Sequence, residues 1–171
     1  MYSYVRKEKP VSVDLAEKLV KEMYNHDLDV NIIDLHNYLF ILWCKYFRET
    51  GDYLYGAEPF IATSTGPRLL SVRDRFCLYP SRVSIWGWGE NIEEDPWFAK
   101  NIEYIKKLRR NSFKVRDIVK TKSWKKFYDK KETDDYWAGG IHEFKEDLKQ
   151  IPFSYIVEEV DNILNQVNAL P

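Results

Sequence analysis

The segment Leu35–Phe47, LHNYLFILWCKYF, constrains the fold most, because apolar residues occupy nearly every side of it. A helix that is apolar all round is typical of the centre of a folded protein. The segment is too short to cross a bilayer, which takes about 20 apolar residues. Acceptor side chains precede it, and Thr50-Gly51 is a typical helix end. We therefore expect a central helix over Asn31–Thr50.

Further helices are predicted on both sides of this central helix, because apolar residues recur at helical spacing. They are expected at 13–24, 69–78, 96–110, 113–120, 123–128 and from 152 onward. β-forming residues at Tyr53–Ile61 and Val83–Trp88 predict a small β element. The expected fold is mainly α, a compact single-domain helical bundle over 11–171 with a basic lead-in at 1–10. The first two helices should form a hairpin and pack with the last helix as the core.

Three segments in order carry a likeness to a known family: VNIIDLHNYLF, TGDYLYGAEPFIA and TSTGPRLLSVRDRF. Their spacing resembles the opening of the Panacea domain, the phage-associated, SocA-like antitoxin family. The likeness covers roughly Val11–Phe76. It assigns structural roles to the motif residues Leu35, Leu39, Phe40, Gly51, Ala62, Gly66 and Pro67.

The chain departs from the family pattern at three positions. Asn37 stands where the family usually has Lys, Thr63 where it has Trp, and Arg68 where it has an apolar residue. A weaker echo, VRDIVKTKSWKKFYDK, lacks the His of the family's later segment. The resemblance implies a helical protein that neutralises a toxin by direct binding or presents it to a protease. The departures leave open a diverged member with another target.

A basic segment lies at 106–131, where twelve lysines and arginines are opposed only by Asp117 and Asp129. Its net charge is +10, so the rest of this chain, which totals −1, carries −11. Three interpretations stay open. The cations could face the acidic stretches 90–95 and 132–135 of the same fold, bind an acidic protein, or bind nucleic-acid phosphates. Interleaved aromatics such as Trp124 could stack on bases.

The run Trp86-Gly87-Trp88-Gly89 is the second candidate contact. Its two rings either cap the core from an extended segment or contact a partner, since tryptophan is enriched in interface hot spots. The candidate partner-binding residues are Arg68, Trp86, Trp88, Lys106, Arg109, Arg110, Lys122, Trp124, Lys125 and Lys126.

No sequence motif indicates catalysis. His26, His36 and His142 form no tight ligand pair, and the chain has no P-loop, no G-x-S-x-G and no G-x-G-x-x-G. Cys44 and Cys77 fit no metal spacing. His36, inside the central helix, is expected to be a hydrogen-bonded structural residue rather than a catalyst. We predict no enzyme, no cofactor and no metal.

The leading functional hypothesis is a non-enzymatic protein-binding module, antitoxin-like or a phage or mobile-element accessory protein. The alternative is a nucleic-acid-binding regulator that uses 106–131, and an enzyme would need a concave pocket with convergent titratable groups. Two unpaired cysteines and no recognisable leader predict a cytoplasmic location and no membrane partner.

Overall fold

Helix α2, Ile32–Thr50, is the centre of the molecule. The computed structural model describes residues 8–77, 83, 91–128 and 149–171. The Asn31 side chain caps the start of α2 by accepting a hydrogen bond from the Asp34 N–H at 2.8 Å. Gly51 ends the helix with φ of 73°, a left-handed conformation that glycine adopts at little cost. Both ends of the central helix thus lie where the caps predict.

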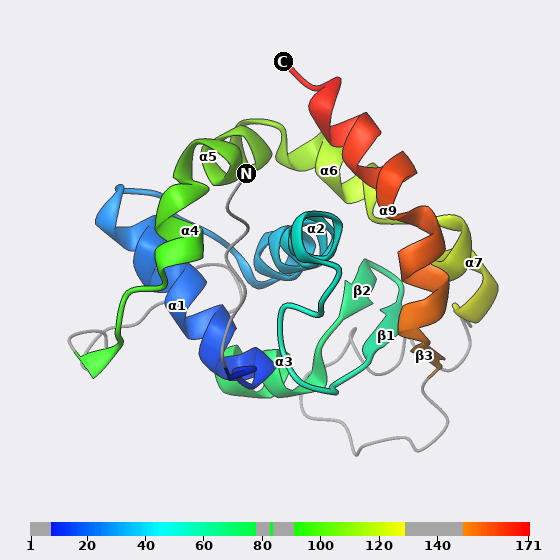
Figure 1. Ribbon diagram of the computed structural model, residues 1–171, viewed down its shortest axis with the longest axis horizontal. Helices are drawn as coiled ribbons and strands as arrows, with labels where there is room; N and C mark the ends of the chain where they lie inside the picture. Colours follow the sequence, from blue (N-terminus) through cyan, green and yellow to red (C-terminus); the bar gives the residue numbers. More distant parts are fainter. Residues whose placement is uncertain (1–7, 78–82, 84–90, 129–148) are drawn as a thin grey trace.

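Other helices surround α2, which is seen end-on in the middle of Figure 1. Their bounds are α1 Ser12–Asn25, α3 Leu70–Phe76, α4 Pro96–Lys100, α5 Ile102–Arg110, α6 Ser112–Ile118, α7 Lys122–Phe127 and α9 Phe153–Asn168. The described part also holds one small antiparallel sheet of three strands. The predicted fold class, mainly α with a small β element, is confirmed.

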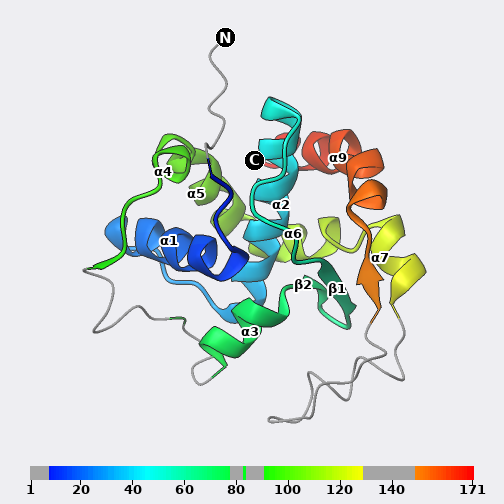
Figure 2. The same ribbon diagram turned by 60° about the horizontal axis from the view of Figure 1, so that its bottom comes forward.

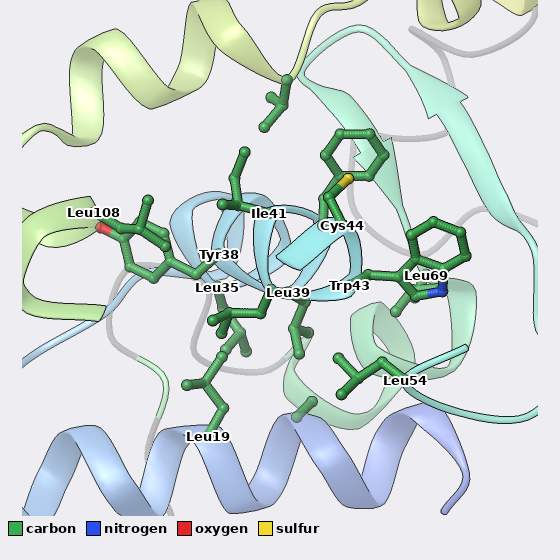
Figure 3. Packing of buried hydrophobic residues seen from close by; sticks show 14 of the residues in the cluster. Leu19, Leu35, Tyr38, Leu39, Ile41, Trp43, Cys44, Leu54, Leu69 and Leu108 are labelled. Carbon is green, nitrogen blue, oxygen red and sulfur yellow. The ribbon is translucent and has the colours of Figure 1, made fainter. Parts of the chain in front are cut away.

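Burial of α2 on several sides comes from elements far apart in the sequence. In Figure 3, Leu19 reaches from α1 toward Leu35 and Leu39, and Leu108 of α5 lies near Tyr38. Helix α9 packs along α2, as expected for the C-terminal helix. Figure 2 shows α1 running across α2, so the predicted antiparallel hairpin of these two helices is wrong. Contacts of α1 with α3, α4 and α5 hold it in this crossing orientation.

The sheet lies beside α2 and has the order β2-β1-β3. Its strands are β1 Phe60–Thr63, β2 Gly66–Arg68 and β3 Gln150–Ile151. The predicted strand begins only at Phe60. It pairs on one side with the residues after a tight turn and on the other with a segment near the C-terminus, and this pairing determines where it begins. Gly66 has φ of 123° at that turn. Val83 is not in a strand and donates its N–H to the Val30 carbonyl at 2.9 Å.

The predicted helix over 96–110 is two helices, because the chain bends at Asn101. Asp95 caps α4 by accepting the Phe98 N–H at 3.0 Å, and the Asn101 amide donates to the Trp97 carbonyl at 2.8 Å. A similar bend at Asn111 separates α5 from α6. These bends allow three short helices to follow the curved surface of the core.

Candidate protein-interaction surface

Helices α5, α6 and α7 carry the described part of the basic segment. Residues 106–128 contain ten lysines and arginines and one acid, Asp117. Lys130 and Lys131, and the acidic stretch 132–135, lie outside the described residues. The structure shows which of the ten cations have partners within the fold and which face solvent without one.

Several cations are bound to neighbouring elements. Arg116 grips Asp34 of α2 through two hydrogen bonds, Nε to Oδ1 at 3.0 Å and a terminal nitrogen to Oδ2 at 3.1 Å. Arg109 donates its Nε–H to the Asp29 carbonyl at 2.9 Å. Lys106 pairs with Glu103 at 3.2 Å, and Lys126 donates to the Tyr155 hydroxyl at 3.0 Å. Part of the positive charge of the basic segment is therefore bound by other groups of the same chain.

Four cations have no such partner. Arg110, Lys114, Lys122 and Lys125 are exposed, and within the described residues none of them makes a hydrogen bond or an ion pair. Arg110 and Lys114 lie on α5 and α6, and Lys122 and Lys125 lie on α7. Within the same described ranges, no ion pair joins the basic segment to Glu93 or Glu94 of the acidic stretch 90–95. These four cations keep their charge available at the surface.

An aromatic side chain, Phe113, lies between Arg110 and Lys114 in the sequence. Phe113, near the start of α6, is 81% exposed. The Arg116 guanidinium carbon lies 5.0 Å from the centroid of its ring, within cation–π range. We call the surface formed by Arg109, Arg110, Phe113, Lys114 and Arg116 the α5–α6 corner.

The α5–α6 corner is fastened to the central helix beneath it. The Tyr38 hydroxyl of α2 lies 2.6 Å from the Ser112 hydroxyl, which donates to the Arg109 carbonyl at 2.7 Å. Burial raises the pKa of Tyr38 to about 12, so its hydroxyl keeps its proton near neutral pH. The hydrogen bond to Asp34 raises the pKa of Arg116, which therefore stays charged. Both links hold α6 against α2.

Two of the predicted partner-binding residues are buried, which corrects their assignment. Arg68 is 1% exposed and donates to the Asn37 side chain at 2.9 Å and to the Pro67 carbonyl at 2.8 Å. Trp124 is 8% exposed and donates its indole N–H to the Thr63 carbonyl at 2.7 Å. Both side chains supply donors to the backbone of the β1–β2 hairpin, so neither presents a surface to a partner.

The remaining predictions on candidate residues divide between confirmed roles and untested ones. His36 is buried and lies within hydrogen-bond distance of two backbone carbonyls, which confirms its predicted structural role. The motif residues Leu35, Leu39, Phe40, Ala62, Gly66 and Pro67 are all buried. Trp86 and Trp88 lie outside the described residues. Lys106, Arg109, Arg110, Lys122, Lys125 and Lys126 lie on helices at the protein surface.

Phe113 was not among the predicted contact residues, although the sequence carries a signal for it. Val115 and Ile118 form the inward face of α6. A position two residues from an inward one lies on roughly the opposite side of a helix, at about 100° per residue. An apolar residue there, flanked by cations, is therefore expected to face solvent.

The fold and this surface define a class of protein: a mainly α-helical domain with a small antiparallel sheet and a basic face on α5–α7. Comparisons of the chain with protein-family models, with curated proteins and with solved structures find no match. In the ranges that the structure describes, no three His, Cys, Asp or Glu residues are grouped as metal ligands. No described helix combines the length and apolarity needed to cross a membrane.

Proposed function

We propose that this chain is a non-enzymatic protein-binding module, antitoxin-like or a phage or mobile-element accessory protein, which neutralises a toxin or host protein by direct binding. The observation that carries the proposal is a set of exposed cations that have no partner among the described residues: Arg110, Lys114, Lys122 and Lys125. The ordered likeness of 11–76 to the Panacea domain supports a toxin or host protein as the class of partner.

The mechanism is occlusion of a functional surface on the partner. Exposed cations attract an acidic partner and raise the association rate, an effect that salt screens over about 8 Å at physiological ionic strength. Apolar contacts that become desolvated on binding then determine how long the complex lives. The module needs no catalytic group for this, because covering the partner's surface is sufficient.

A nucleic-acid-binding regulator is the competing function, since phosphates would also satisfy these cations. Exposed acids are mixed among the cations on α5 and α6, at Glu103 and Asp117. A duplex carries a phosphate charge about every 1.7 Å, so acids on its track are costly. A folded protein partner can place its carboxylates opposite the cations and away from these two acids. The mixed charges therefore favour a protein over nucleic acid as the partner.

The test co-expresses the chain with the products of neighbouring genes, each of which is first assayed alone for growth arrest. We expect one product to arrest growth, the chain to relieve the arrest, and a tagged copy to retain that product as a stoichiometric complex through a high-salt wash. An empty vector and a catalytically inactive toxin are the controls. Failure of every arresting neighbour to be relieved, with only nucleic acid retained at low salt, would refute the proposal.

A further inference from the structure

The α5–α6 corner combines three features of a contact site: an exposed aromatic ring, cations with which no described residue pairs, and a rigid base. Phe113 is the most exposed of the large apolar side chains in the described part, at 81%. Aromatic residues and arginine are enriched among interface residues that dominate binding energy. The corner places both kinds of side chain next to each other on α6 and on the end of α5.

Phe113 is held in place before any partner arrives. Arg116 lies 5.0 Å from its ring centroid, and the Asp34 carboxylate fixes Arg116 through two hydrogen bonds of 3.0 and 3.1 Å. Asp34 is itself buried and accepts the Asn31 amide at 2.9 Å. Ordering a side chain on binding costs conformational entropy, and part of that cost is already met in the folded chain.

The cations at the corner are only partly satisfied by the fold. Arg110 and Lys114 have no partner in the described residues, and Arg109 uses its Nε–H on a backbone carbonyl rather than on a carboxylate. Of the four cations at the corner, only Arg116 is bonded to a carboxylate in the described residues, that of Asp34. The positive excess lies around the ring and favours carboxylates placed on either side of an apolar group.

We infer that the α5–α6 corner binds an acidic segment of the partner protein in which one apolar side chain lies between carboxylates. The apolar side chain covers the Phe113 ring, and the carboxylates pair with Arg110 and Lys114. This inference rests on the proposed function and adds the place of contact and the chemistry of the partner. Helix α7 differs, because its Trp124 is buried and its Phe127 is only partly exposed and packs on the Tyr155 ring at 5.1 Å.

The test uses two fluorescein-labelled synthetic peptides of alternating Asp and Glu, one with a central Leu and one with Ser at that position. Fluorescence anisotropy at low salt measures the binding of each to the full chain. We expect the Leu peptide to bind about tenfold more tightly, as burial of one apolar side chain predicts. Phe113→Ser should remove the difference between the peptides, and Arg110→Glu with Lys114→Glu should abolish binding of both.

The matched comparison changes charge equally on α7, with Lys122→Glu and Lys125→Glu, which weakens the long-range attraction for both peptides alike and leaves the corner intact. It should retain the tenfold preference, and circular dichroism checks that every variant folds. Loss of binding in the α7 variant with an unaffected corner variant would overturn the inference while the co-expression result still supported the proposed function. No binding of either peptide would also overturn it, and so would equal binding of both.

Tighter binding of labelled oligothymidine at the corner would assign the site to nucleic acid. A dimer that the corner variant dissociates in sedimentation would assign it to a second copy.

Discussion

At the scale of single residues, the buried polar side chains behind the β1–β2 hairpin set a constraint on stability. The two ring nitrogens of His36 lie 2.8 Å from the Ile32 carbonyl and 3.1 Å from the Leu69 carbonyl. Burial, and next the charge of Arg68, lowers the pKa of His36 from 6.5 to about 3. Burial also lowers the pKa of Arg68 to about 9, so Arg68 stays charged at neutral pH.

His36 predicts a loss of stability in mild acid. Its pKa is lower in the folded state, so the unfolded chain takes up the proton first as the pH falls below 6.5. The stabilisation is complete above that pH and declines toward pH 3 by at most about 1.4 kcal/mol per pH unit. At pH 5 the loss is about 2 kcal/mol.

Urea denaturation of the wild type and of His36→Gln at pH 7 and pH 5 measures this contribution. The glutamine is neutral at both pH values, so the free energy of unfolding should change less with pH in the variant. Val11→Gln, at an exposed position without a titratable side chain, is the control and should keep the steeper pH dependence of the wild type. An unchanged pH dependence in His36→Gln would contradict the assignment.

At the scale of elements, one carboxylate from a loop joins the starts of two helices. Neither Val11 before α1 nor Leu69 before α3 offers a capping side chain. Glu58 instead accepts the Ser71 N–H at 3.2 Å and the hydroxyls of Ser12 and Ser71. A negative charge at a helix start also opposes the positive end of the helix dipole. The loop after α2 thereby ties α1 to α3.

Glu58→Ala should lower the free energy of unfolding by about 1–2 kcal/mol, because the start of α3 loses the acceptor of its Ser71 N–H and the hydroxyls of Ser12 and Ser71 lose theirs. Glu158→Ala, an exposed position on α9, is the matched control and should stay within about 0.5 kcal/mol of the wild type. Chemical denaturation followed by circular dichroism measures both variants. Equal stability of the two variants would show that the helix starts are satisfied by water instead.

At the scale of the whole molecule, α2 joins segments from both ends of the described chain into one core. Helix α1, near the N-terminal end, and helix α9, near the C-terminal end, both contact it, as do α3, α5, α6 and β2. Each of these elements packs apolar side chains against α2. Unfolding of α2 would therefore expose those side chains on all of the elements together. The structure therefore predicts cooperative unfolding of the described part.

Denaturation should show one transition, with tryptophan fluorescence and far-UV circular dichroism changing together. Leu39→Ala, in the middle of α2, should lower the free energy of unfolding by about 2–5 kcal/mol and leave the transition single. Exposed Val11→Ala is the control and should change stability little. Two separated transitions, or a fluorescence change that precedes loss of helix, would contradict a shared core.

Prediction from the sequence succeeded where the deciding interactions are local. Asn31 and Gly51 cap α2 through hydrogen bonds to residues within four positions, and residue type placed both ends of this helix. The strand pairing was missed, because β3 joins β1 from far along the chain. The bend at Asn101 was also missed, since the apolar spacing of 96–110 is that of a continuous helix.

Composition, periodicity and caps were enough to establish the mainly helical class, the central helix and the excess of positive charge in 106–131, because they act through neighbours in the chain. Which charged and aromatic side chains reach solvent depends instead on the packing of distant segments. The buried Arg68 donates a hydrogen bond to Asn37, 31 positions away, and Arg116 donates hydrogen bonds to Asp34, 82 positions away. Exposure depends on what packs over a side chain, and that covering comes from distant segments whose approach no local pattern records.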